Sequence, residues 1–193
     1  MQILGKVPEG DTLVDMLQAL TRLSNLDIPS IRDAIAAMFG LDASELLGNQ
    51  GARVYNIPPI LVRLADRPLA TAGDAIETID DLAKHIFALM VDQGFDIGSI
   101  PDVIDQTFPH LGEVEVSDIV ATLEFVCGSI VPSLCNTTQE ITNLIHALHG
   151  EFVPAGPSGS PTRGLAHLLP TGRNFYACDP QTLPSLAAWE VGE

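Results

Sequence analysis

Apolar residues recur at intervals of three and four positions through most of residues 11–149, which is the spacing of one buried face of an α-helix. Polar capping residues, glycines and prolines divide this pattern into separate elements joined by short connections. The expected helices lie at 11–24, 30–39, a short stretch opened by 42–45, about 58–64, 78 to about 93, 101–106, 117 to about 130, and 138–149.

Several of these helices have specific start or stop signals. Ser30 is expected to cap the helix over 30–39, which Gly40 stops, and Pro58-Pro59 is expected to lie just before or inside the first turn of the helix that carries 60–64. Thr78-Ile79-Asp80-Asp81 is expected to open the clearest helix, which Gly94 ends. The Asp80–Asp81 pair then lies in a first helical turn, where acidic residues are ordinary, so we assign it no acid–base role. Asp42-Ala43-Ser44-Glu45 and Thr137-Thr138-Gln139-Glu140 have the spacing of a capping box. Pro132 is expected to break the apolar helix that starts at Ser117.

The last 44 residues, 150–193, do not follow the helical pattern. They hold six of the 16 glycines and six of the 14 prolines, so no helix runs uninterrupted there before about Ser185. Large apolar residues such as Phe152, Phe175 and Trp189 distinguish this stretch from a flexible linker. We therefore predict a mainly α protein in two parts: a helical array ending at residue 149, and an ordered but irregular segment over 150–193 that ends in the start of a helix.

Charge and composition exclude several functions. The net charge is −16, and residues 1–149 carry 7 basic and 21 acidic side chains, which would repel a phosphate backbone and argue against nucleic-acid binding. No apolar run of about 20 residues and no signal peptide are evident, so we expect a cytoplasmic protein without a membrane span. The sequence has no GxxxxGK[ST] loop, so ATP binding by this chain is not expected.

The three cysteines give no disulfide framework and no zinc signature, because their number is odd and no CxxC spacing occurs. Cys127 and Cys135 lie in an apolar helical stretch and are expected to be core thiols.

Arg163 and Arg173 are the only cations of residues 150–193, and each has a glycine neighbour. Glycine lets a ligand approach the backbone, and a guanidinium pairs with carboxylates. The alternative is that both arginines bond nearby carbonyl groups and hold an irregular loop together. His146 and His149 have helical metal-ligand spacing, but no third ligand is identifiable and histidines near a helix C-terminus are often stabilised by the helix dipole.

Two motifs in this segment carry a family resemblance. Gly-Pro-Ser-Gly-Ser-Pro-Thr-Arg-Gly over 156–164 and Leu-Pro-Thr-Gly-Arg-Asn-Phe-Tyr over 169–176, followed by Asp-Pro, resemble the CobN/magnesium-chelatase H family, whose large subunit inserts a metal ion into a tetrapyrrole. Ser158, Arg173 and the Phe175–Tyr176 pair are similar to the cobalt branch, because the magnesium branch has Gly-Pro-Gly-Gly and Leu-Pro-Thr-Gly-Lys-Asn. His149, Ala155 and Leu165 depart from the family pattern. We call residues 150–193 the signature segment.

The resemblance implies that the chain is an internal piece of a longer cobaltochelatase subunit, inactive when isolated. The implied reaction is insertion of cobalt into hydrogenobyrinic acid a,c-diamide in cobalamin synthesis, with ATP bound by separate AAA+ motor subunits. A magnesium-chelatase H-type subunit for protoporphyrin IX and a non-catalytic helical interaction module remain alternatives. The implied site has arginines as carboxylate clamps, a histidine as proton acceptor and neighbouring groups that contact the ring: Arg163, Arg173, His167, Thr162, Asn174, Gly172 and Tyr176.

Overall fold

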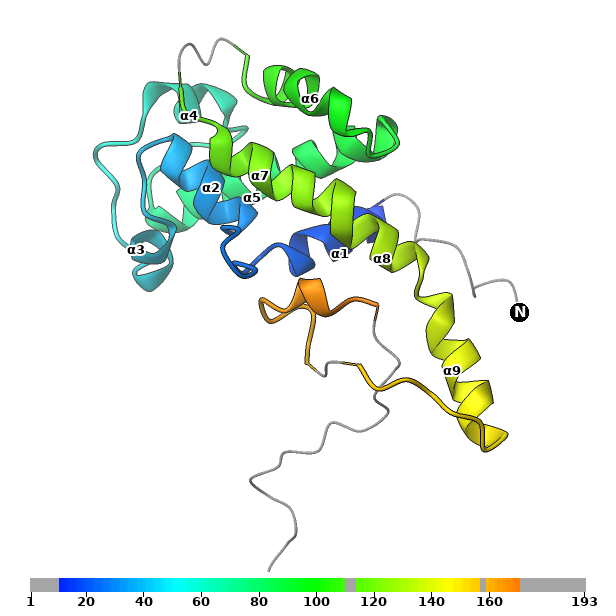
Figure 1. The fold of residues 1–193 in the computed structure, drawn as a ribbon. Helices are drawn as coiled ribbons and strands as arrows, with labels where there is room; N and C mark the ends of the chain where they lie inside the picture. Colours follow the sequence, from blue (N-terminus) through cyan, green and yellow to red (C-terminus); the bar gives the residue numbers. More distant parts are fainter. Residues whose placement is uncertain (1–10, 110–113, 157–158, 171–193) are drawn as a thin grey trace, which may run out of the picture.

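The computed structural model describes residues 11–109, 114–156 and 159–170 and shows helices joined by loops (Figure 1). In these ranges, strand-like pairing is limited to two isolated bridges, Asn25–Ile28 and Arg53–Thr71, which confirms the mainly α prediction. The elements in chain order are α1 (Asp11–Leu20), α2 (Ile31–Met38), α3 (Ala43–Gly48), α4 (Pro59–Leu64), α5 (Ala72–Asp92), the 3-10 turn η1 (Ile97–Ser99), α6 (Ile100–Thr107), α7 (Ser117–Phe125), the π-helical turn η2 (Val126–Ile130), α8 (Val131–Cys135), α9 (Thr138–Leu148) and the 3-10 turn η3 (Ala166–Leu168).

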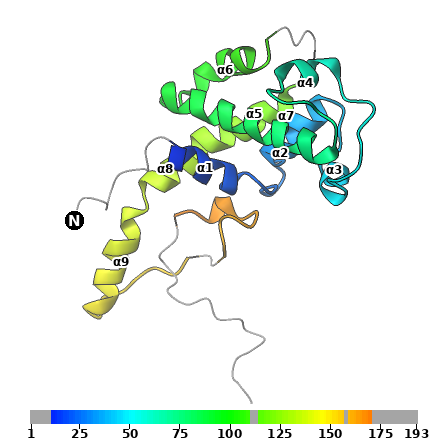
Figure 2. The same cartoon turned by 180° about the vertical axis from the view of Figure 1, so that it is seen from behind.

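Helix α5 is the centre of the core. It contacts α1, α2, α3 and α6, which surround it in the view of Figure 2. Its inner face is fully buried at six core positions: Ala75, Ile79, Ala83, Ile86, Phe87 and Met90. Burying large apolar side chains of this kind contributes about 1.5–3 kcal/mol each, so this face is the main apolar source of stability in the described fold.

The start of α5 corrects the sequence prediction. The helix begins at Ala72, and its N-cap is Thr71, not Thr78. The Thr71 Oγ1 accepts from the Asp74 amide at 3.2 Å, and the Asp74 carboxylate accepts from the Thr71 amide at 2.8 Å, forming a complete capping box. Gly73, a poor helix former, masked this start in the sequence. Glycine fits there because a Cβ would stand 3.2 Å from the Gln50 carbonyl oxygen.

Asp80 and Asp81 therefore lie inside α5 and not in its first turn. Arg32 of α2 donates to Asp80 through two parallel bonds, Nε to Oδ1 at 2.8 Å and Nη2 to Oδ2 at 2.7 Å. This fork raises the pKa of the Arg32 guanidinium, although partial burial opposes the rise. Arg67 donates to Asp81 at 2.7 Å and also pairs with Asp66 and Glu77. Both aspartates thus link α5 to neighbouring segments.

Pro132 does not break the apolar helix. The chain runs from α7 through the π-helical turn η2 into α8, where Pro132 occupies the first turn. The wider π-helical turn just before Pro132 accommodates its ring and its missing N–H, so the chain keeps a helical path.

The stretch Ser117–Leu148 is also long and apolar enough, by length and composition alone, to cross a bilayer. The most apolar part of this stretch has a mean hydropathy of 1.5, so the expectation that no apolar run reaches this length is corrected. Inside the protein, however, Ile119, Leu123 and Ile130 are fully buried, as in a core helix. In the most apolar part of the stretch 39% of the residues are buried, as expected of a helix with one covered face.

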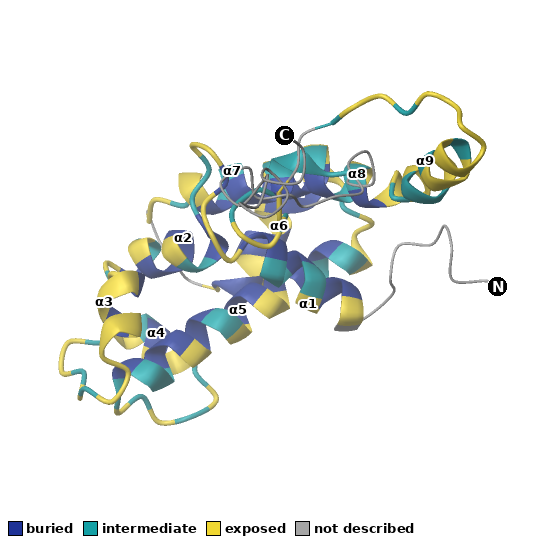
Figure 3. Ribbon diagram, turned by 90° about the horizontal axis from the view of Figure 1, so that it is seen from below, coloured by how far each residue is buried: buried dark blue, intermediate teal, exposed yellow. Residues whose placement is uncertain are grey.

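Helix α9 projects away from the body, and Figure 3 shows it with intermediate and exposed residues only. The expected capping box at its start is wrong. Thr137 has helical backbone angles, φ −61° and ψ −18°, where an N-cap needs an extended conformation. Its hydroxyl therefore donates backwards to the Leu134 carbonyl at 2.7 Å. Gly150, at φ +75°, follows the helix end as expected.

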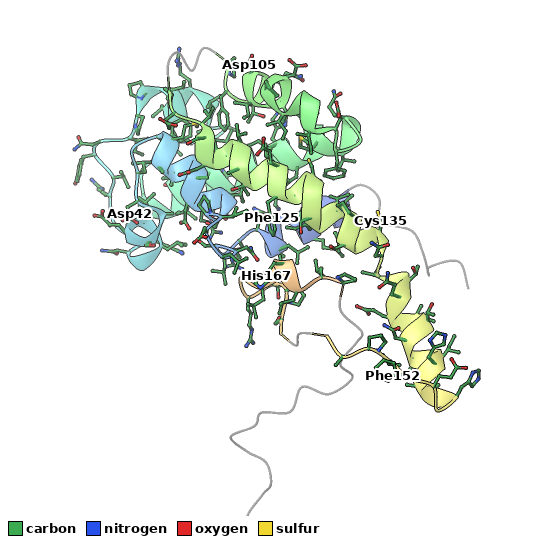
Figure 4. All side chains as sticks on the ribbon, in the orientation of Figure 1. Asp42, Asp105, Phe125, Cys135, Phe152 and His167 are labelled. Atoms are coloured by element: carbon green, nitrogen blue, oxygen red, sulfur yellow. The ribbon has the colours of Figure 1, made fainter. Side chains whose placement is uncertain are left out.

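The two described cysteines differ in environment. Cys127, in η2, is buried, and desolvation with the nearby Asp96 charge raises its pKa to about 11. Cys135, at the end of α8, is exposed, so the expectation of a core thiol is wrong for it. The helix carries Cys135 to the outside because its next turn leaves the body toward α9 (Figure 4).

Candidate functional site

The described part of the signature segment returns from α9 and docks against the helical body. Its only helical turn among the described residues is η3, which contacts η2. Ala166, the first residue of η3, is 1% exposed, so the backbone of this turn is part of the core. The last described residues of the segment end at Pro170.

Asn25, in the loop between α1 and α2, holds this turn. Its Oδ1 accepts from the Ala166 amide at 2.6 Å, and its Nδ2 donates to the carbonyl oxygens of Leu20 at 3.3 Å and Leu23 at 3.0 Å. Asn25 is 3% exposed, so these bonds satisfy a buried side chain. Sequence reasoning missed Asn25, because an asparagine after a helix indicates a turn and carries no signal for a distant partner.

Gly164 brings the segment onto the same loop. At φ +75° it adopts the left-handed conformation, and a Cβ there would lie 2.8 Å from the Ser24 carbonyl oxygen. Because that oxygen is backbone, it cannot move aside easily, and glycine is required at this position of the first motif.

Thr162 and Arg163, just before this glycine, both face solvent. The Arg163 backbone amide donates to the Ser160 carbonyl at 2.9 Å. Its guanidinium makes no hydrogen bond or ion pair with any of the residues that the structure describes. Thr162 Oγ1 lies 3.3 Å from Ser160 Oγ. In the described part of the chain the Arg163 side chain is therefore not used to hold the loop in place.

His167 lies in η3, beneath the helical layer that contains Phe125 (Figure 4). Its Nδ1 is buried and has no hydrogen-bond partner among the described residues. A buried polar atom without a partner costs free energy, so packing and not hydrogen bonding holds this nitrogen in place.

The remaining predicted site residues, Gly172, Arg173, Asn174 and Tyr176, lie outside the described residues. Thr162, Arg163 and His167 lie in the docked stretch 159–170, where the first two face solvent and the His167 ring has one buried nitrogen.

The histidine pair near the end of α9 has a simpler explanation than a metal site. His146 Nε2 lies 3.7 Å from the Glu151 carboxylate, and His149 is the C-cap residue of the helix. Across residues 11–109, 114–156 and 159–170, no three His, Cys, Asp or Glu side chains are arranged to hold a metal ion.

A cleft of about 310 Å³ lies elsewhere in the body. Its lining comes from α5, α6 and the segment around α4: Leu64, Asp66, Thr78, Asp81, Leu82, His85 and Thr107. None of these residues belongs to the signature segment, and Asp81 is already paired with Arg67. The described parts of the two sites are therefore separate.

The fold and the docked segment define a class of protein: a helical scaffold against which a glycine- and proline-rich segment packs. Comparison with protein families gives a match over residues 1–193 to the family described as CobN/Magnesium Chelatase. The chain belongs to this family.

The chain spans only a small part of the length of the relatives that it matches. An aerobic cobaltochelatase subunit CobN from a Sinorhizobium species is 33% identical over 217 residues, which cover all of this chain and 16% of the relative. The solved catalytic subunit of cobaltochelatase from Mycobacterium tuberculosis superposes with a TM-score of 0.60 at 30% identity, covering all of this chain and 14% of that structure. The H-type subunit of a magnesium chelatase from Chlorobaculum parvum is 33% identical over 63 residues, only 33% of this chain.

Proposed function

We propose that this chain forms part of the large, tetrapyrrole-binding subunit of an ATP-dependent cobaltochelatase. The proposed reaction inserts Co²⁺ into hydrogenobyrinic acid a,c-diamide during cobalamin synthesis. The similarity to a cobaltochelatase subunit across the whole chain carries this proposal, because the similarity to the magnesium-chelatase subunit covers only a third of it.

The signature segment supplies the proposed substrate contacts. A corrin precursor carries peripheral carboxylates, and a guanidinium pairs with a carboxylate through two parallel hydrogen bonds. The exposed Arg163 guanidinium, unused by the described part of the loop, supports this role, and Arg173 would provide the second clamp. In the same proposal Thr162 and Asn174 bond ring substituents, while Gly172 and Tyr176 contact the macrocycle.

Metal insertion also requires proton transfer. Co²⁺ that enters the corrin macrocycle displaces the inner N–H proton of the ring, and a neutral imidazole is a suitable acceptor near pH 7. We propose that His167 accepts a proton at Nε2, because its Nδ1 is buried away from any substrate. The cobalt ion is a substrate in this scheme.

The proposed partners are the rest of a large subunit and AAA+ motor subunits that bind ATP, in the cytoplasm. The division into a scaffold over 1–149 and a signature segment over 150–193 belongs to the same proposal. Leu144, Ile145 and Leu148 of α9 are 46%, 46% and 77% exposed, and the helix has no buried residue. Because the chain covers 16% of its Sinorhizobium relative, we propose that the remainder of a large subunit covers this face, and that the isolated chain does not insert metal.

A chimera tests this function. Residues 1–193 would replace the matching region of the Sinorhizobium subunit, and cobalt insertion would be measured with the motor subunits and ATP, beside tetrapyrrole binding by fluorescence quenching. We expect insertion of cobalt into the corrin precursor. Insertion of magnesium into protoporphyrin IX would favour the magnesium alternative, and an inability to bind either tetrapyrrole would favour an interaction module.

The Arg163→Ala variant of the chimera tests the clamp. Loss of a charged hydrogen bond should weaken tetrapyrrole binding by about ten- to a hundredfold, or roughly 1.5–3 kcal/mol. Arg163→Lys keeps the charge and loses the planar fork, so it should also bind more weakly than the parent. Arg53→Ala, at another exposed arginine, is the matched control. If Arg163→Ala binds as the control does, Arg163 is not a clamp.

A further inference from the structure

The loop between α1 and α2 is a preformed support. The Thr21 hydroxyl donates to the Leu17 carbonyl at 2.8 Å, and the Ile31 amide donates to the Thr21 carbonyl at 3.1 Å, which closes the loop at its base. At its tip, Asn25 and Ile28 exchange backbone hydrogen bonds of 2.8 and 2.9 Å. Leu26, between them, has φ 55°, a left-handed conformation that a leucine adopts only when its surroundings impose it.

These constraints fix the direction of the Asn25 side chain. Nδ2 donates to the carbonyl oxygens of Leu20, the last residue of α1, and of Leu23 in the loop, so Oδ1 points away from both and accepts from the Ala166 amide. Asn25 and Ala166 are 141 positions apart and both almost fully buried. In a buried environment the loss of either partner leaves the other unsatisfied, which makes this contact specific.

The same loop contacts the segment a second time. A Cβ atom added at Gly164 would lie 3.6 Å from the Leu23 Cβ and 2.8 Å from the Ser24 carbonyl oxygen. Arg163 precedes Gly164 and His167 follows Ala166 directly. Two contacts with one rigid loop therefore anchor the stretch that contains both candidate substrate residues.

We propose that Asn25 is a positioning residue: through its hydrogen bond to Ala166 it sets where Arg163 and His167 stand relative to the substrate. The expected effect of Asn25 on substrate binding rests on the proposed function. The link between Asn25 and Ala166 does not, because both residues belong to this chain. Asn25 does not touch the substrate. Its effect is to hold the signature segment in one place before the substrate arrives, so that the free energy of binding does not include this ordering cost.

Hydrogen–deuterium exchange of the 193-residue chain tests the coupling without any ligand. In Asn25→Ala, the amide of Ala166 should exchange about tenfold faster, because its acceptor is gone. Asn25→Asp keeps an oxygen acceptor and should show a smaller increase. Asn56→Ala, at an exposed asparagine, should leave the rate unchanged, and the amides of α5 should be unaffected in every variant. An unchanged exchange rate at Ala166 would overturn the proposal. An equal rise in exchange throughout α5 would also overturn it, because that pattern indicates general destabilisation of the fold.

Gly164→Ala provides an independent perturbation that leaves Asn25 intact. The added methyl group collides with the Ser24 carbonyl and should also speed exchange at Ala166. In the chimera, Asn25→Ala should weaken tetrapyrrole binding at least several-fold, with partial recovery in Asn25→Asp. If exchange rises and binding is unchanged, the positioning role is wrong. A failure of the proposed function is distinguishable, because the chimera with the unaltered chain would then already fail to bind tetrapyrrole.

Discussion

Helices α5 and α9 have the same kind of apolar periodicity and occupy opposite environments. Of the 21 residues of α5, ten are buried, whereas α9 has no buried residue among its 11. Their starts also differ: a complete capping box begins α5, and no side-chain cap bond is made by the N-cap residue of α9. Four helices of this chain cover the apolar face of α5, but the apolar face of α9 remains exposed.

The difference shows what an amphipathic pattern means physically. It identifies the side of a helix that gains by burial, and it does not identify the surface that covers it. For α5 the covering surface is in the same chain. For α9 the proposed cover is the rest of a larger subunit, so this helix should contribute little to the stability of the chain alone.

The largest expected contrast comes from truncating one apolar residue in each helix. Phe87→Ala in α5 removes a fully buried ring and should lower the free energy of unfolding by about 3–5 kcal/mol. Leu144→Ala in α9 removes a side chain that is 46% exposed and should change it by less than about 0.5 kcal/mol. Urea denaturation of both variants measures the difference. Similar losses would show that α9 is packed in solution.

The cysteines sharpen the same comparison within one helical stretch. With a pKa of about 11 instead of 9.0, Cys127 forms about a hundredfold less thiolate at pH 8 than an unperturbed thiol. Cys135 is exposed to a maleimide or a disulfide reagent whereas Cys127 is buried, so Cys135 should react at least about tenfold faster. Peptide mapping of the partly modified protein gives both rates. Comparable rates would mean that η2 opens readily.

Two neighbouring aspartates test whether α5 is also held by ion pairs. Asp80→Asn removes the charge from a fork with Arg32, whose side chain is only 12% exposed, and should cost about 1–3 kcal/mol. Asp81→Asn affects a pair in which both side chains are more exposed, 52% for Asp81 and 35% for Arg67, and should cost less than about 0.5 kcal/mol. Denaturant titration at pH 7 distinguishes them, and equal effects would contradict the assigned difference in burial.

The smallest effect concerns the cap of α5 in acid. Hydrogen bonds from the Thr71 side chain and from the Thr71 and Ala70 amides lower the pKa of Asp74 below its ordinary value of 3.8. The unfolded chain therefore binds the proton first, and this contribution is present above pH 3.8 and disappears as the pH falls through the folded pKa. The stability difference between the parent and Asp74→Asn should shrink below pH 4. A difference that persists unchanged to pH 2 would refute this linkage.

Capping residues, glycines and prolines in the sequence predicted the helices whose ends are set by residues next to them in the chain. Ser30 caps α2, Gly40 follows its end at φ +70°, and Pro59 occupies the first turn of α4, all as expected. The prediction failed where two starts competed: Thr71 and Thr78 both have an aspartate three residues later, and the sequence does not show which one the chain uses. At Thr137, helical backbone geometry prevented the cap that its neighbours suggested.

Pairing between distant segments was not predictable from one sequence. Nothing in the spacing of residues connects Arg32 to Asp80 or Asn25 to Ala166, because these contacts depend on how the helices pack. The first signature motif was recognisable from its residues, and the structure adds a physical reason for one of them, the left-handed Gly164 against a backbone carbonyl. The second motif remains a prediction from sequence.

The hydrogen bond between Asn25 and Ala166 also bears on the order of folding. It closes a loop of 141 residues, whereas α1, α2, α3 and α5 contact one another across much shorter separations. Closing a longer loop costs more chain entropy, so contacts of low sequence separation form first. We therefore expect the helical body to assemble early and the signature segment to attach to it late, as the chain leaves the ribosome. A chain interrupted before residue 166 would then still contain a folded scaffold to which residues 159–170 have not yet attached.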